Sequence, residues 1–232
     1  MVAQPLDVVS PVGGAMLTDE PWLAARIADL SASWRTDSMR VGATLWWCMT
    51  ASALVEQVVG ALAQERPIPA PTLDRLALTL RADGTVERIE IDDAGTGEPG
   101  GAPDVAEPTM GRDAGTAEID IAAALRETLT TVIDRLAAVS GVREAALWAV
   151  VTDVVASWAV DAGRPIIGRR LADAIGAVLP EPRFVEVAGR TFVRRASCCL
   201  VYEAPGREKC VSCPKRRPEE RAALLADYAR RG

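Results

Sequence analysis

The chain has 232 residues, of which 49% are hydrophobic, and a formal net charge of −6. This length is sufficient for a sizeable buried core. The chain contains no histidine, which excludes histidine-ligated zinc, a non-haem iron triad, a Rieske-type cluster and any histidine-based catalysis. The N-terminus lacks the basic flank and sustained apolar core of a secretory signal, so we expect the reducing cytoplasm, where clustered cysteines are more often metal or redox groups than disulfides.

Helical periodicity dominates the first part of the chain. Residues 20–34 place large apolar side chains on one face and carry Pro21 in the expected first turn, which predicts an amphipathic helix. Residues 41–63 form a longer apolar stretch, diluted by polar residues such as Thr50 and Glu56. A membrane span needs roughly 20 predominantly apolar residues, so we predict a buried helix in which Cys48 is a core thiol.

The middle of the chain changes character twice. Residues 73–91 form two alternating runs around Asp83-Gly84, and glycine accepts the positive φ of a tight turn, so this segment predicts a β-hairpin. Residues 92–116 are rich in glycine, proline and acids, and we expect an exposed, mobile loop there. Three helices are predicted next, at about 119–139, 142–160 and 168–179, with Trp148 and Trp158 in the core.

The last part of the chain predicts a small module of its own. A short extended pair at 184–187 and 191–194 turns at Ala188-Gly189, and Pro218 opens a final helix. From residue 183 onward twelve Lys or Arg stand against six Asp or Glu, so a basic segment follows an acidic body. We predict an α+β fold with a mainly helical domain at 1–182, containing a hairpin near 73–91 and a flexible loop near 92–118, and a C-terminal cysteine module at 183–232.

Four of the five cysteines lie close together in this module, namely Cys198, Cys199, Cys210 and Cys213. The spacer of two residues between Cys210 and Cys213 lets both sulfurs face one metal. Adjacent cysteines on an extended backbone point to opposite sides, so Cys198 and Cys199 fit one zinc ion poorly, whereas the two irons of a [2Fe-2S] cluster are separate points. The spacing favours an iron-sulfur cluster and leaves a structural zinc site and a dithiol redox switch as alternatives.

The run at 189–214 resembles the C-terminal signature of the FhuF family of ferric-siderophore reductases. That signature consists of Gly-Arg, basic residues, Cys-Cys-Leu-x-Tyr, a Pro-Gly turn and Cys-x-x-Cys-Pro. The matching positions are Gly189, Arg190, Arg194, Arg195, Cys198, Cys199, Leu200, Tyr202, Pro205, Gly206, Cys210, Cys213 and Pro214. The resemblance implies that all four cysteines ligate one [2Fe-2S] cluster, and it covers only this part of the chain closely.

The resemblance also implies a function, which is one-electron reduction of a ferric siderophore in the cytoplasm with no catalytic residue beyond the cluster. Oxygen-rich siderophores bind hard Fe(III) better than Fe(II), so one electron weakens the chelate. No Gly-rich dinucleotide fingerprint is present, so we expect an external electron donor such as a flavodoxin, a ferredoxin or a reductase. Two other interpretations remain, a zinc-binding module and an iron-sulfur electron-transfer or redox-sensing protein without a siderophore substrate. No integral membrane segment is expected, although peripheral contact at the inner face of the membrane stays open.

Basic residues flank the cysteines, with Arg194, Arg195, Arg207 and Lys209 the nearest candidates for a role. A four-thiolate [2Fe-2S] centre is negatively charged and gains another negative charge on reduction, so nearby cations should favour the reduced state. The same residues could dock an acidic electron donor, or form no more than a solvated face. Nucleic-acid binding is not expected, because the acidic remainder of the chain would repel phosphate.

Overall fold

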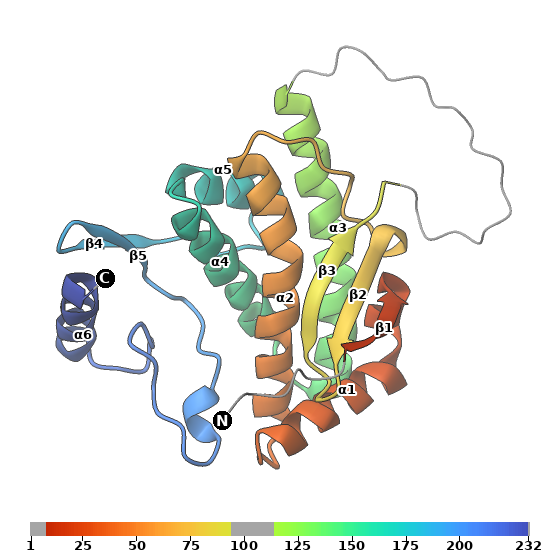
Figure 1. The fold of residues 1–232 in the computed structure, drawn as a ribbon, viewed down its shortest axis with the longest axis horizontal. Helices are drawn as coiled ribbons and strands as arrows, with labels where there is room; N and C mark the ends of the chain where they lie inside the picture. Colours follow the sequence, from red (N-terminus) through yellow and green to blue (C-terminus); the bar gives the residue numbers. More distant parts are fainter. Residues whose placement is uncertain (1–7, 94–113, 232) are drawn as a thin grey trace, which may run out of the picture.

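The computed structural model describes the backbone of residues 8–93 and 114–231, and the side chains of 11–93 and 118–231. Helices and two small antiparallel sheets alternate along the chain (Figure 1), which confirms the predicted α+β class. The elements are β1 Val8–Gly13, α1 Glu20–Ser33, α2 Met39–Ala63, β2 Leu76–Arg81, β3 Val86–Ile91, α3 Ala114–Ser140, α4 Glu144–Asp161, α5 Pro165–Ile175, β4 Phe184–Val187, β5 Arg190–Val193 and α6 Pro218–Arg231.

Helix α2 runs through the middle of the helical body, with α4 on one side and the three-stranded sheet on the other (Figure 1). Trp46 and Trp47 are almost completely buried in it. The indole of Trp47 donates to the carbonyl of Leu147 on α4 at 2.9 Å, so its polar atom is satisfied inside the core. Within the described residues α2 is the one helix long and apolar enough to span a membrane, and 61% of that stretch is buried. The predicted buried core helix is therefore confirmed.

The first sheet has the strand order β1-β2-β3, and all its pairs are antiparallel. The predicted hairpin corresponds to β2 and β3, with Gly84 at φ +79° in the turn. A Cβ at this glycine would lie 2.8 Å from the carbonyl oxygen of Arg26 on α1, so the turn requires glycine both for its conformation and for this close approach. The sequence did not predict β1, whose segment contains Pro11 and pairs with a strand far along the chain.

The remaining helices match the predicted segments with shifted ends. Helix α3 begins at Ala114, earlier than predicted, and α4 spans nearly the predicted range. Helix α5 ends at Ile175, four residues before the predicted end, because Gly176 follows with φ +97°, a conformation that ends the helix. The predicted mobile loop at 92–116 falls mostly on residues 94–113, which lie outside the described residues.

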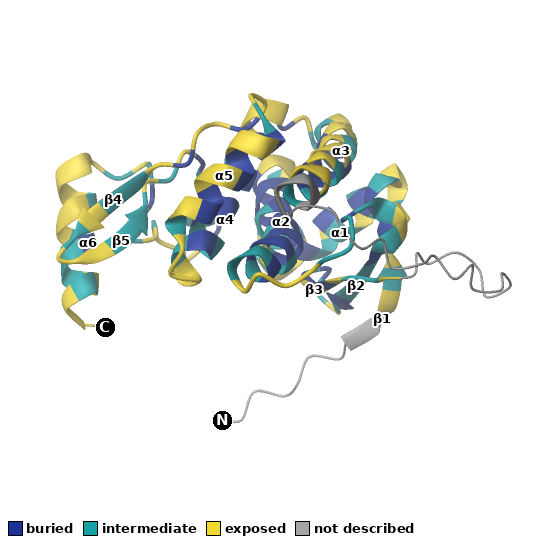
Figure 2. Cartoon of the chain, turned by 90° about the horizontal axis from the view of Figure 1, so that it is seen from above, coloured by how far each residue is buried: buried dark blue, intermediate teal, exposed yellow. Residues whose placement is uncertain are grey.

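The C-terminal segment extends away from the helical body (Figure 2) and consists of the β4-β5 hairpin, the cysteine stretch and α6. The hairpin turns at Ala188 and Gly189, both with positive φ, as the sequence predicted. Phe192 of β5 meets Tyr228 of α6 edge to face, with the ring centroids 6.2 Å apart. Because β5 also packs against α4, the chain that leaves this hairpin runs back along the helical body. This path brings the cysteines to the surface of α2 and α4.

Candidate metal centre

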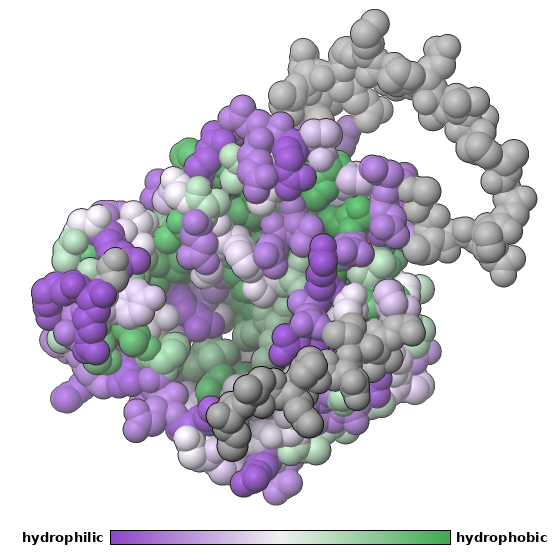
Figure 3. Space-filling view, in the orientation of Figure 1, coloured by the Kyte–Doolittle hydropathy of each residue, from purple (hydrophilic) through white to green (hydrophobic). Residues whose placement is uncertain are grey.

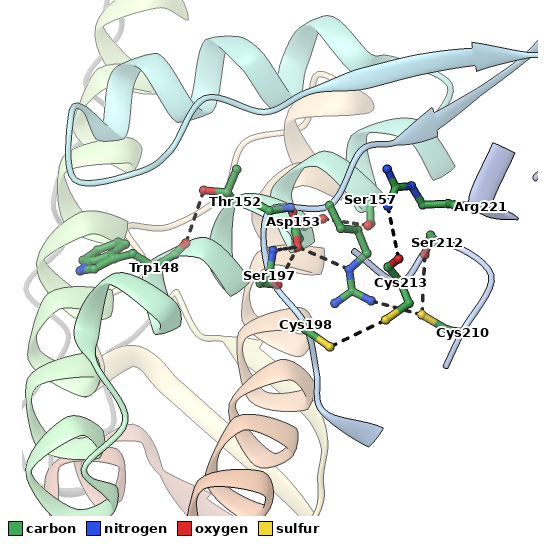
Figure 4. Close-up of polar contacts among 12 residues, drawn as sticks. Trp148, Thr152, Asp153, Ser157, Ser197, Cys198, Cys210, Ser212, Cys213 and Arg221 are labelled. Atoms are coloured by element: carbon green, nitrogen blue, oxygen red, sulfur yellow. Dashed lines mark hydrogen bonds and ion pairs between the residues drawn. The ribbon is translucent and has the colours of Figure 1, made fainter. Parts of the chain in front are cut away.

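A buried carboxylate on α4 holds the start of the cysteine stretch. Asp153 is only 3% exposed and accepts hydrogen bonds from the backbone N–H groups of Ala196 and Ser197, at 2.7 and 2.8 Å. The Ser197 hydroxyl donates a third bond at 2.6 Å. Figure 4 shows Ser197 beside Asp153, with the chain then leading directly to Cys198. A carboxylate with several such donors is well compensated for burial, so the position of Cys198 is fixed from within the helical body.

Cys198 and Cys213 form a close pair of thiols. Their sulfur atoms lie 3.9 Å apart and point toward each other in Figure 4. Two thiolates bound to one tetrahedral metal at about 2.3 Å are separated by roughly 3.8 Å. Cys213 is buried. Partial burial of the Cys198 thiol raises its own pKa to about 11, and the nearby Cys213 thiol contributes to this rise. The pair therefore has the spacing that a shared metal atom requires.

The other two cysteines lie beside Arg195. Its Nη1 atom is 3.9 Å from the sulfur of Cys210, and Arg195 lines the same cavity as Cys199. Burial disfavours the charged guanidinium, but the Asp153 carboxylate and the nearby thiolates outweigh burial and raise the pKa of Arg195. Leu200, directly after Cys199, has φ +61°, so the chain turns sharply as it leaves the cysteine pair.

Cys198 and Cys199 face different surroundings, as expected for neighbours on an extended chain. Cys198 pairs with Cys213, whereas Cys199 lines a cavity with Cys48 and Arg195. Within the described residues, no group of three or more Cys, Asp or Glu converges on one point that could hold a single metal ion. The structure therefore brings one pair of thiols together, Cys198 with Cys213, and places Cys199 and Cys210 near Arg195.

The cysteine stretch also matches a known protein family. Residues 195–215 match the model described as the FhuF 2Fe-2S C-terminal domain. The match covers 21 of the 232 residues of the chain. The resemblance read from the sequence is thereby confirmed, and with it the [2Fe-2S] cluster as the cofactor. A search of curated proteins found no match to the chain.

The four basic residues singled out in the sequence have different positions around the cysteines. Arg195 contacts Cys210. Arg207 stacks on the Trp34 ring, with its Cζ atom 4.9 Å from the ring centroid. The Lys209 ammonium group donates to the carbonyl of Lys215 at 3.2 Å. Arg194 is exposed, and its side chain has no polar partner within the described part of the chain. Of these four, Arg195 alone reaches a cysteine sulfur in the structure.

Sequence reasoning missed residues that support the cysteine stretch. Arg216 donates to the backbone carbonyls of Cys210, at 2.9 Å, and Lys209. Arg221 of α6 donates to the carbonyl of Cys213 at 3.5 Å. The sequence signal for Asp153 was an acid flanked by apolar residues in the middle of α4, which is unusual for a surface carboxylate. Arg216 and Arg221 carried no such signal, because in the sequence they are two of many charged residues in the basic C-terminal segment.

Cys48 has a second neighbourhood that the sequence did not show. It packs against the core, as predicted, but it is only partly buried and lines the cavity that also contains Cys199 and Arg195. Burial raises the pKa of its thiol to about 12, and the nearby Cys199 acts in the same direction. A neutral thiol at this position suits its place against the apolar helices.

Proposed function

We propose that this protein reduces Fe(III) held in oxygen-rich chelates, such as ferric siderophores, by one electron. The observation that carries the proposal is the Cys198–Cys213 pair at 3.9 Å within the segment that matches the FhuF 2Fe-2S domain. We assign Cys198 and Cys213 to one iron of the cluster, because their sulfurs lie 3.9 Å apart, and Cys199 and Cys210 to the other. This assignment differs from the expectation from spacing that Cys210 and Cys213 face the same metal. We further propose that residues 183–232 form an iron-sulfur module attached to a helical domain at 1–182.

The chemistry needs no acid, base or nucleophile from the chain. When bound, the [2Fe-2S] cluster supplies one electron at a time. The reaction takes one electron from an external donor and converts one chelated Fe(III) to Fe(II), with no bond to carbon made or broken. Oxygen-donor chelates hold Fe(II) much less firmly than Fe(III), so the reduced iron is released. A chain without histidine is suited to this task.

The residues around the cysteines fix the position of the centre and place a positive charge beside it. Asp153 fixes the backbone of Ala196 and Ser197, and the rigid α4 helix therefore determines where Cys198 lies. Arg195 places a positive charge against Cys210 and is itself held by Asp153, whose Oδ2 atom lies 3.4 Å from its Nε atom. A fixed cation beside thiolates favours the more negative, reduced state.

The charge and the thiols of the cysteine module indicate which electron donor and which cellular compartment suit the protein. The cysteine module carries a basic excess, with twelve Lys or Arg against six Asp or Glu from residue 183 onward. This charge is complementary to acidic one-electron carriers of the flavodoxin or ferredoxin type, and complementary charge speeds encounter. We infer that the protein works in the cytoplasm, where free thiols persist and where such carriers are available to it.

The experiment is an anaerobic electron-transfer assay on the purified full-length protein. Visible and EPR spectra are recorded before and after dithionite, excess dithionite is removed, and a ferric chelate is then added. We expect a red-brown protein whose reduced-state EPR signal disappears as Fe(II) appears. A red-brown protein that keeps its reduced signal with every ferric chelate would indicate an electron carrier or redox sensor without a chelate substrate. A colourless protein with one tightly bound zinc would contradict the assignment.

A further inference from the structure

A cavity of about 520 Å³ opens beside Cys198, between the helical body and the cysteine segment. Its volume is within the range of small-molecule sites, roughly 300–1,000 Å³. Figure 3 shows a hollow between the helical body and the C-terminal segment, with hydrophobic residues along part of it. The cavity walls come from α2, the start of α4, the stretch 196–200 and the residues after Cys213. A ligand bound there would lie directly against a proposed cluster ligand.

The side chains that line this cavity give it a definite chemical character. Arg40, Arg143 and Lys215 supply cations, and no Asp or Glu is among the lining residues. Arg40 is paired with Glu203 at 2.7 Å. Arg143 and Lys215 are exposed, and neither forms an ion pair with a residue that the structure describes. The remaining charge is thus positive and is available to a ligand.

The rest of the wall is largely apolar. Val142 and Leu147, around the start of α4, and Leu200, after the cysteine pair, are buried residues that line the cavity. A site with an apolar wall and a few placed cations selects a ligand that combines hydrophobic surface with negative charge. Chelates of Fe(III) with catecholate or carboxylate donors have this combination, because their oxygen donors are anionic and the surrounding scaffold is organic.

We propose that this cavity binds the chelate, and that Arg143 and Lys215 make the protein select net-negative ferric chelates over uncharged ones. This inference rests on the proposed function and adds to it a location and a charge preference. In this arrangement the anionic iron-binding face meets the two cations, the scaffold meets Val142 and Leu147, and the iron comes to rest near Cys198. The electron then leaves the protein on the side of the Cys198–Cys213 pair, while Arg195 lies by the other two cysteines.

The test separates binding from electron transfer by using gallium(III), which replaces Fe(III) in chelates but accepts no electron under these conditions. Affinities of the holoprotein are measured for a net-negative gallium tris-catecholate and an uncharged gallium tris-hydroxamate. The variant R143Q/K215Q should bind the tris-catecholate roughly tenfold or more weakly, since it lacks two charge-assisted contacts. Its affinity for the tris-hydroxamate should change by less than about threefold, and its visible spectrum should not change.

The matched control is R88Q/R217Q, which removes the same charge from exposed positions that do not line the cavity. It should leave the affinity for both chelates within about twofold of wild type. A second variant, Ala146→Phe, places a large side chain in the cavity wall and should weaken both chelates. Equal losses in the two charge variants, or no loss in R143Q/K215Q together with unchanged binding by Ala146→Phe, would overturn the cavity assignment.

A parallel assay with the ferric chelates keeps this inference distinct from the proposed function. If the reduced wild-type protein transfers its electron to ferric chelates and the cavity variants change neither binding nor rate, the function stands and the cavity assignment is wrong. If the gallium affinities shift as expected but no ferric chelate is reduced, the cavity is a chelate site on a protein that is not a reductase. A loss seen only in the rate of reduction by an acidic ferredoxin would instead assign Arg143 and Lys215 to donor docking, and would overturn the cavity assignment.

Discussion

The helical body and the C-terminal segment differ in how they are held. In the body, long helices bury a continuous set of large apolar side chains around α2. After residue 183, the described hydrophobic residues that are buried are Leu200, Ala204, Cys213 and Leu225. Figure 2 shows this difference as a dark, buried body beside a largely exposed end. The C-terminal segment instead relies on polar contacts from Asp153, Arg216 and Arg221, and we infer that it relies on its metal as well.

Loss of the metal should produce the largest difference between the responses of the two regions. Cys213→Ser removes a buried sulfur that lies 3.9 Å from Cys198, and we expect complete loss of the visible iron-sulfur spectrum. The helical circular dichroism should fall by less than about a tenth, because the body has its own core. Cys48→Ser is the control, since Cys48 is close to Cys199 but belongs to no proposed metal pair. An unchanged spectrum in Cys213→Ser would remove Cys213 from the ligand set.

A truncation in the core of the helical body should lower the stability of the body and leave the iron-sulfur cluster intact. Leu129→Ala in α3 removes a completely buried side chain, and we expect a loss of about 3 kcal/mol in the free energy of unfolding, from lost burial and the remaining cavity. The visible spectrum of the folded protein should be unchanged. Leu225→Ala in α6 is the comparison, and its cost should be smaller because few residues of the C-terminal segment are buried and such a site can collapse more readily. Chemical denaturation followed by circular dichroism and by absorbance measures both regions. A bleached spectrum in folded Leu129→Ala would show that the cluster depends on the body core.

The contact that joins the regions is Asp153. Asp153→Ala leaves the backbone N–H groups of Ala196 and Ser197 without their acceptor, and we expect a loss of about 2–4 kcal/mol in the local stability of this stretch. Hydrogen exchange at these two amides measures that loss directly. Asp134→Ala removes an exposed carboxylate from α3 and serves as the control. Unchanged protection at residues 196 and 197 in Asp153→Ala would mean that the cysteine stretch is positioned by other contacts.

These contacts also explain how much could be predicted from the sequence. The helices and the 73–91 hairpin follow from local periodicity and one glycine turn, and the structure confirms them. The four cysteines were found because their spacing is itself local information, whereas the close approach of Cys198 and Cys213 was visible only in three dimensions. Strand β1 escaped prediction because Pro11 weakens its local signal and its partner is distant in sequence.

The bond between Asp153 and Ser197 escaped prediction for a similar reason, since it joins residues 44 positions apart. The cavity beside Cys198 likewise combines residues from four separate stretches. Local patterns therefore identified the chemistry of the centre, while its supports and its access depended on packing between the two regions. Basic residues were the hardest case, because sequence alone gave Arg194 and Arg195 the same role.

The smallest expected effect distinguishes those two arginines. Arg195 lies 3.9 Å from the Cys210 sulfur, whereas Arg194 is exposed and contacts no cysteine within the described structure. Arg195→Gln should therefore lower the one-electron midpoint potential by roughly 30–60 mV, since the reduced state loses a nearby cation. Arg195→Lys keeps the charge and should recover most of the shift, while Arg194→Gln should change the potential by less than about 15 mV because solvent screens it.

Protein-film voltammetry on the four proteins measures these potentials under identical conditions. A shift in Arg195→Gln that Arg195→Lys does not recover would point to lost contact with Asp153 rather than to lost charge. Equal shifts in Arg194→Gln and Arg195→Gln would show that the overall positive charge of the C-terminal segment sets the potential. The position of Arg195 between the two regions would then have no particular effect on the potential. Arg195 would act mainly as a structural link between Asp153 and Cys210.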